Sequence, residues 1–328
     1  MPLSLRRGSV TAVVERHERL VRLEVDEVAC VAYPGLTGPV AVGDDVLVNV
    51  QARALQLGSG GFDVLYANLT RGLDLPSEDR AHVMKLPYTP LQVAVRHAEE
   101  DGPHAAALDG LPVVCCTLHS QVAPVCAGLG GDARIAYIQL PGGALPVSLS
   151  DAVRALRARG LLHATVAVGP CLEADVACVS VASALAWAAA TGFDAVVCAI
   201  GPGIVGTATV LGHGGVAAAE SANAASALGG RPIVALRASA ADARDRHRGV
   251  SHHVRAVLRL CLGDVVTAWP RGYPTPLWLE PGDEVEVTGW EEMCVGLPLA
   301  HMGRTPQDDP LFFAAAFAAG RAARNLLH

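Results

Sequence analysis

Apolar runs alternate with amphipathic segments over the last three quarters of the chain. The segments with helical spacing predict helices at Leu91–Glu100, Ser120–Gly128, Leu149–Arg159, Asp175–Thr191, Val216–Leu228 and Val254–Leu262. Between them, continuous apolar runs predict buried strands at Leu111–Thr117, Arg134–Leu140, Ala164–Gly169, Asp194–Gly201, Pro232–Arg237 and Asp264–Trp269. Apolar strands separated by helices are typical of a parallel sheet that helices cover on both faces. The pattern therefore predicts a mainly parallel α/β domain over residues 81–328.

Two further parts of the chain follow other patterns. Short strands of period two, punctuated by Gly and Pro, predict a small β-barrel or sandwich over residues 1–70. A polar stretch at residues 71–80 predicts the linker to the α/β domain. At the other end, a strand-like segment, Leu277–Val287, and an Ala-rich helix, Pro310–Leu327, predict a C-terminal appendage of that domain.

Composition narrows the class of protein. Hydrophobic residues make up 51% of the chain and charged residues 17%, which excludes a disordered protein. The formal charge of −7 disfavours non-specific binding to nucleic acid. No run of about 18 apolar residues predicts a membrane span. The nine cysteines form no CxxC pair and lie mostly in apolar runs, Cys115 and Cys116 included. We therefore expect buried thiols, no zinc ribbon, and a cytoplasmic protein that does not enter a membrane.

A glycine-rich loop follows one of the predicted strands. Ligands of open α/β sheets bind beyond the carboxyl ends of the strands, and glycines let backbone amides turn towards an anion. Here the residues that match G-x-G-x-x-G, with the threonine that follows, are Gly201, Gly203, Gly206 and Thr207. No helix opens at once after them, because Leu211–Gly215 prolongs the loop. The pattern favours an anion site over a dinucleotide fold, and the alternative is a loop packed under a helix.

Basic residues gather in the segment 237–253 of an otherwise acidic chain. Ser239 is placed to cap one helical turn and Ser251 to cap the next helix, whose first turn would hold two histidines near free backbone amides. Arginine forks bind phosphate and carboxylate through two bonds. The alternative is a solvated basic face. We expect a small anionic ligand to contact Arg237, Asp242, Arg244, Arg246, Arg248 and Ser251, with His213 beside the glycine-rich loop.

Histidines are the candidates for acid–base chemistry, because their pKa lies near working pH. These are His247, His252 and His253 in the basic segment, and His119 at the end of the first predicted sheet strand. The three histidines of the segment, with His213 or Asp242, are also an alternative metal-ligand set. We expect adjacent histidines on a helix to diverge, however, and predict no metal site. A serine triad through Ser120 or Ser251 is disfavoured because no G-x-S-x-G motif is present.

Lysine occurs once, at Lys85, among 25 basic residues. Arginine does not replace lysine where a compact ammonium is needed, so a single retained lysine points to function, with chance survival on the surface as the alternative. We expect Lys85 to contribute charge, as a candidate catalytic residue, from the junction of the two domains.

Several strings together resemble the bacterial family DUF3866. They are Gly38–Asn49, Leu57–Gly61, His82–Gln92, Gly201–Thr207 and Arg246–His253, and the likeness runs on to Met302-Gly303-Arg304. The resemblance implies a cytoplasmic bacterial protein and places Lys85 and Tyr88 in a family string, which makes Tyr88 a ligand-binding candidate. It also implies a Gly-His pair after the third sheet strand, where this chain has Val168–Glu173. Chemistry that relied on that histidine would be altered here. The resemblance implies no particular enzymatic activity.

These observations predict an enzyme or binding protein for a small anionic ligand, phosphorylated or nucleotide-like. The glycine-rich loop and the Arg/His segment would hold it. One alternative is a non-enzymatic ligand sensor or scaffold that binds a macromolecule. Another is a metal-dependent hydrolase that uses the histidines. The sequence identifies no cofactor, and a homodimer is expected only because it is the commonest oligomer.

Overall fold

The computed structural model describes residues 3–55, 61–71, 74–76, 78–100, 102, 104–279 and 283–327. The chain divides into two compact units, Met1–Arg96 and His97–His328. A two-stranded antiparallel sheet of β6 (Val83–Lys85) and β7 (Val93–Val95) follows the predicted linker at residues 71–80 and belongs to the first unit. Among the described residues, no helix has both the length and the apolar character that a bilayer crossing requires.

The first unit contains a closed five-stranded barrel. Its strand order is β1 (Leu5–Arg16), β2 (Val21–Val25), β3 (Val28–Ala32), β5 (Asp63–Asn68) and β4 (Asp45–Asn49). Alternate apolar residues such as Val10, Leu23 and Val46 point inward and are almost fully buried, which is why a period of two builds a filled barrel. Two short helices, α1 (Pro34–Thr37) and α2 (Gln51–Ala54), connect strands.

The second unit is built on a parallel sheet of seven strands. Their order is β11 (Val176–Cys178), β10 (Ala164–Val168), β9 (Ile135–Leu140), β12 (Ala195–Ile200), β8 (Pro112–Cys116), β13 (Arg231–Ala235) and β16 (Val266–Thr267). Every neighbouring pair in this sheet runs parallel. The predicted fold class, a small barrel followed by a mainly parallel α/β sheet, is confirmed.

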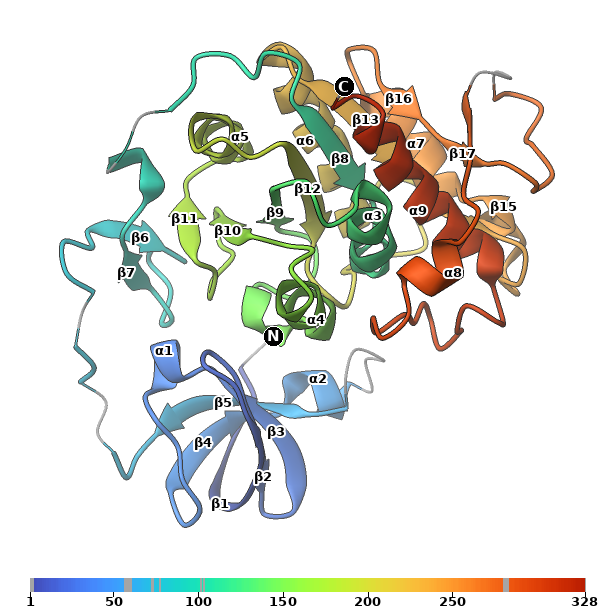
Figure 1. Ribbon diagram of the computed structural model, residues 1–328. Coiled ribbons are helices and arrows are strands. Elements are labelled where there is room, and N and C mark those ends of the chain that lie inside the picture. The colour runs from blue at the N-terminus through green and yellow to red at the C-terminus, as the bar shows by residue number, and fades with distance from the viewer. Residues whose placement is uncertain are drawn as a thin grey trace. The chain divides into compact units, whose positions relative to one another are not determined.

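Helices cover both faces of this sheet (Figure 1). On one face lie α3 (Val122–Leu129), α4 (Asp151–Ala158), α8 (Trp290–Met293) and α9 (Pro310–Arg324). On the other lie α5 (Val181–Ala190), α6 (Ala217–Ala227) and α7 (His252–Leu260). Successive residues of β8 alternate between the two cores, with Val114 and Cys116 in one and Val113 and Cys115 in the other. A strand buried on both sides must be apolar throughout, which explains the continuous runs in the sequence.

Some predicted elements were wrong in detail. Residues Leu91–Glu100 form β7 and a 3-10 turn, η1 (Ala98–Glu100), rather than a helix. The predicted helix Asp175–Thr191 contains the edge strand β11 before α5, which Ser180 caps by accepting from the Ser183 N–H. The strand-like segment near residue 285 is reduced to β18 (Glu284–Val285), which pairs with β17 (Trp269–Pro270). Residues 280–282 of that segment lie outside the described residues.

The cysteine pair in β8 belongs to the core, as expected. Cys115 and Cys116 are both fully buried. Burial raises the pKa of the Cys115 thiol to about 12 and that of Cys116 well above its ordinary value. A thiol in this state is a small apolar side chain rather than a nucleophile.

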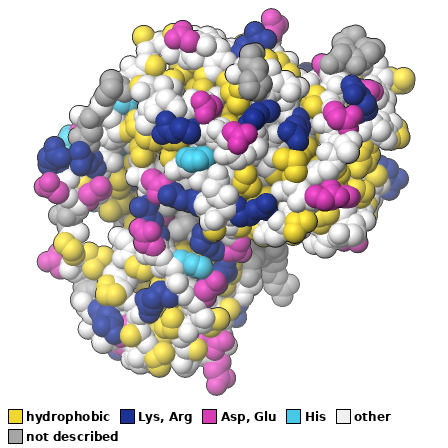
Figure 2. Space-filling view, in the orientation of Figure 1, with side chains coloured by type: hydrophobic (Ala, Val, Ile, Leu, Met, Phe, Trp, Pro, Cys, Tyr) yellow, Lys and Arg dark blue, Asp and Glu magenta, His cyan; other side chains and the backbone are white. Residues whose placement is uncertain are grey.

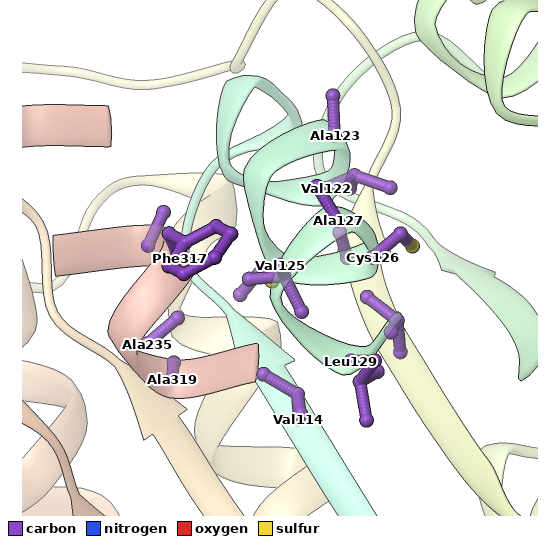
Figure 3. Packing of buried hydrophobic residues seen from close by; sticks show 14 of the residues in the cluster. Val114, Val122, Ala123, Val125, Cys126, Ala127, Leu129, Ala235, Phe317 and Ala319 are labelled. Carbon is purple, nitrogen blue, oxygen red and sulfur yellow. The ribbon is translucent and has the colours of Figure 1, made fainter. Parts of the chain in front are cut away.

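Two glycines allow α3 and α9 to touch along their backbones. Figure 3 shows Phe317 of α9 beside Val125 of α3. A Cβ atom on Gly128 would lie 2.4 Å from the carbonyl oxygen of Phe317, and one on Gly320 would lie 2.1 Å from that of Val125. These residues are glycine because no side chain fits between the two helices.

We expect Gly320→Ala to destabilise the second unit by about 1–3 kcal/mol, the usual result of overpacking a core. This is the net loss, after the gain of about 1 kcal/mol that alanine brings within a helix. Urea unfolding measures it. Gly131→Ala is the matched control, because its Cβ atom would meet nothing closer than 3.9 Å. Equal urea midpoints for Gly320→Ala and Gly131→Ala would contradict this prediction, because they would mean that α3 and α9 move apart at little cost.

Candidate functional site

The candidate site lies at the carboxyl edge of the parallel sheet, where β13 ends. Directly after it, β14 (Ala238–Ser239) pairs antiparallel with β15 (Gly249–Val250), and the Ser251 N–H donates to the Arg237 carbonyl at 2.9 Å. This ribbon closes residues 240–248 into a loop whose 3-10 turn η5 (Asp245–His247) lies next to the start of α7. The basic segment is therefore folded back on itself, which brings its histidines together.

Ser251 caps α7, as the sequence predicts. Its hydroxyl accepts from the His253 N–H at 3.3 Å and lies 2.7 Å from Nδ1 of His247. Ser239 does not cap a helical turn, because it belongs to β14. Its hydroxyl accepts from the Asp242 N–H and donates to the Asp309 carboxylate at 2.5 Å. Both serines thus fix the loop rather than offer a nucleophile.

Imidazole rings pack against one another at the start of α7. The centroids of His247 and His252 lie 4.9 Å apart, those of His247 and His253 4.9 Å, and those of His252 and His253 4.2 Å. One ring nitrogen from each of the three lies within 4.8 Å of the others. His213 stacks on His253 with a centroid distance of 3.7 Å. The expectation that His252 and His253 diverge was wrong, because their rings lie against each other and both contact the ring of His247.

A buried arginine contacts this group of rings. The Arg237 side chain is only 4% exposed, its Nη1 donates to Nδ1 of His253 at 3.3 Å, and its Nη2 lies 3.7 Å from the Asp242 carboxylate. Its Nε is buried and has no partner among the described residues. Burial, followed by the charge of Arg244, lowers the Arg237 pKa to about 10, so the guanidinium is still charged at neutral pH.

Asp242 joins the arginines of the site. Its carboxylate accepts from Nε and Nη2 of Arg244, both at 2.9 Å, and from Nη2 of Arg304 at 3.2 Å. Nε of Arg304 in turn donates to the fully buried Asp309 at 3.2 Å. The bonds from Arg244 are the main reason that the pKa of Asp242 lies well below its usual value. The carboxylate is ionised and is shared by guanidinium groups from three segments of the chain.

This environment keeps the imidazoles neutral. Burial, and then the charges of Arg237 and Arg244, lower the pKa of His247 to about 4. Burial, and then the neighbouring rings of His213 and His252, lower the pKa of His253 to about 3. Burial, and then the charge of Arg246, also lower the pKa of His252. At neutral pH each ring therefore carries one proton and one free lone pair.

The glycine-rich loop is held mainly by backbone packing. A Cβ atom on Gly201 would lie 2.0 Å from the Ala144 carbonyl oxygen, in the loop that follows β9. The amides of Val205 and Thr207 already donate to the carbonyls of Gly142 and Gly212, and Gly206 bridges to His213. Gly203 has a φ of +70°, a conformation that favours glycine. The loop thus positions His213, whose Nε2 donates to the Val210 carbonyl at 3.0 Å.

Comparison with known proteins gives one family. The model of the family described as "Protein of unknown function (DUF3866)" matches residues 29–275. The chain belongs to the DUF3866 family. The search of curated proteins and the search of solved structures find no match. In this DUF3866 chain the matched range contains the glycine-rich loop and the basic segment.

Three residues of the site were missed by sequence reasoning, and all lie beyond the DUF3866 match. They are His301, Arg304 and Asp309. His301 stacks on Phe312 with a centroid distance of 3.8 Å, and its Nδ1 lies 3.2 Å from the Ser120 hydroxyl. Its Nε2 is buried and has no partner among the described residues. The available signal was Met302-Gly303-Arg304, the last string of the family resemblance, which sequence reasoning left without a role.

Other predicted residues lie outside the group of rings. His119 donates from Nδ1 to the Ile200 carbonyl at 3.1 Å and accepts at Nε2 from the Ser150 hydroxyl at 2.6 Å. Arg246 and Arg248 are exposed, and Arg248 pairs with Asp245 at 3.5 Å. Lys85 and Tyr88 belong to the first unit, where Lys85 is buried at the end of β6 and Tyr88 is fully exposed.

The buried His119 predicts a pH dependence of stability. Burial lowers its pKa to about 4 in the folded chain, against about 6.5 when unfolded. Below pH 6.5 the unfolded chain therefore binds the extra proton, and stability falls until about pH 4. We expect His119→Gln to reduce this slope by up to one proton, or about 1.4 kcal/mol per pH unit.

Urea unfolding of the DUF3866 chain between pH 7 and 4 measures the slope. His163→Gln, which removes an exposed histidine of the same unit, reports the effect of losing a histidine as such. Parallel curves for wild type and His119→Gln would contradict the assignment of a neutral, buried His119.

Proposed function

We propose that the chain binds a small anionic ligand, phosphorylated or nucleotide-like, beside Arg237 at the carboxyl edge of the sheet, and acts on it as an enzyme. One observation carries the proposal. Arg237 is buried, charged at neutral pH, and leaves its Nε–H without a partner among the described residues. A buried donor on a charged group is costly unless something accepts from it, and an anionic oxygen is the strongest such acceptor.

The balance of charge supports an anion. Asp242 is already engaged by Arg244 and Arg304, while Arg237 lies 3.7 Å from its carboxylate. Arg304 is shared with Asp309, so two carboxylates face three guanidinium groups. The excess positive charge is concentrated at Arg237, the most deeply buried of the three. A phosphate or carboxylate group on a ligand would neutralise it.

The neutral imidazoles support chemistry as well as binding. Because Arg237 donates to Nδ1 of His253, the proton of the neutral His253 ring is placed on Nε2. That nitrogen is then a donor towards a ligand oxygen. His252, whose Nε2 is buried and without a partner among the described residues, is the candidate to accept a proton. One donor and one acceptor beside an anion are the groups that general acid–base catalysis needs.

The burial of Arg237 favours a small ligand over a macromolecule. A docking surface for nucleic acid needs exposed arginines, and of the four arginines in the segment 237–253 only Arg246 and Arg248 are exposed. On the face seen in Figure 2, basic and acidic side chains are interspersed rather than gathered by sign. These features support the small-ligand hypothesis over the scaffold hypothesis.

A thermal-shift screen with inorganic phosphate, nucleotides and sugar phosphates tests the proposal. At about 100 times its dissociation constant a ligand adds about 2.7 kcal/mol of stability. We expect Arg237→Met to abolish the shift and Arg237→Lys to retain part of it, because lysine keeps the charge without the fork. Each variant is compared with its own unliganded Tm, so that a less stable variant still gives a result.

Arg259→Met is the matched control, since it removes an exposed arginine from α7. It should leave the ligand-induced shift unchanged. An equal shift in wild type and Arg237→Met, or no shift with any anion in the screen, would contradict the proposal.

A further inference from the structure

We propose that His247, His252 and His253 form a binding site for one divalent transition-metal ion of the zinc class. The inference goes beyond the anion site, because the ion would be held by imidazole nitrogens whether or not an anion contacts Arg237. With the ion bound, it replaces the acid–base roles given above to His252 and His253, because a ring nitrogen that binds a metal can neither donate nor accept a proton.

The geometry of the nitrogens is the first argument. One ring nitrogen from each residue lies within 4.8 Å of the other two, and the residues come from η5 and from the first turn of α7. With bonds of about 2.0–2.1 Å, two nitrogens on one tetrahedral zinc lie about 3.3 Å apart. An ion would therefore draw the three rings together by rotation of their side chains.

The hydrogen bonds of the rings are the second argument. Nε2 of His252 is buried and makes no hydrogen bond among the described residues. Burying a polar nitrogen without a partner costs free energy, and a bound ion would be the missing partner. His247 is held at Nδ1 by the Ser251 hydroxyl at 2.7 Å, so its Nε2 is the nitrogen offered to an ion. A histidine that binds a metal through one ring nitrogen usually donates the N–H of the other to an oxygen, which fixes the orientation of the ring. For His247 that oxygen is the Ser251 hydroxyl, whose position is fixed because it also caps α7.

Arg237 opposes the ion and also suggests how the two sites interact. It donates to Nδ1 of His253 through a long bond of 3.3 Å. If His253 binds an ion through Nε2, its proton lies on Nδ1, which then no longer accepts from Arg237. The guanidinium is released from that bond and its positive charge is left for an anion. Three protein ligands would leave a fourth position open, as in catalytic rather than structural zinc sites.

Direct metal binding tests the inference. The full chain is prepared without a histidine tag, treated with a chelator, and titrated with Zn²⁺ or Co²⁺ in buffer free of phosphate. We expect one equivalent to remain after dialysis, and Co²⁺ to give the intense visible absorption of a four-coordinate site. A wild-type chain that retains no ion would overturn the inference without any variant.

Variants identify the ligands. We expect His252→Ala to weaken zinc binding by more than the 10–100-fold that loss of an outer-shell partner costs. His247→Gln is a second ligand variant, in case one of them folds poorly. His163→Ala, which changes the exposed residue just before β10, is the matched control and should bind zinc as wild type does. Equal losses in His163→Ala and His252→Ala would show binding at scattered surface histidines and contradict the site.

Arg237→Met separates this inference from the anion proposal. It should abolish the phosphate-induced thermal shift but retain one equivalent of zinc. Zinc binding without any anion binding would leave the metal site standing and refute the anion site, and the reverse result would refute the metal site alone.

Discussion

The candidate site depends on a single buried carboxylate. Asp242 receives both nitrogens of the Arg244 fork and one from Arg304, and it lies close to Arg237. Without it, two buried or half-buried guanidinium groups would face each other without a counter-charge, a situation that usually costs several kcal/mol. Asp242 itself is fixed by Ser239, which Asp309 of the α9 N-terminus holds in turn. The C-terminal helix is therefore tied to the site by the same chain of bonds.

The parallel sheet explains why these groups meet. Because all its neighbouring strands run in one direction, the loops that follow β8, β9, β12 and β13 share one edge. Their backbones approach so closely that Gly142, Gly143 and Gly214 leave no space for a Cβ atom. The glycine-rich loops are thus a consequence of packing at this edge, and what they contribute to the site is the position of His213. The chemistry is supplied by side chains from the segment after β13.

The sequence predicted what is local and missed what is distant. The sheet strands were predictable because burial on both faces requires a continuous apolar run, as in β9 and β12. The basic segment was predictable because its arginines and histidines are neighbours in sequence. His301, Arg304 and Asp309 each bond to a residue of the site that lies about sixty positions away or more, so no local pattern links them to it. The edge strand β11 was missed because three residues are too few to show a period.

The same electric field has opposite effects on the two ligands proposed for the site. Burial, and then the positive charges of Arg237 and Arg244, keep His247 neutral, which frees its lone pair for a metal ion. Those charges also repel the ion, whose affinity should then depend on how much of the field is neutralised. An anion against Arg237 would remove that repulsion, and by linkage a bound ion would strengthen the binding of the anion by the same factor. A cation and an anion held side by side, each making the other's binding more favourable, is the arrangement that metal-assisted reactions of phosphorylated or carboxylated substrates require. The residues of the site are best explained if both ligands bind, because each ligand then balances the charge of the other.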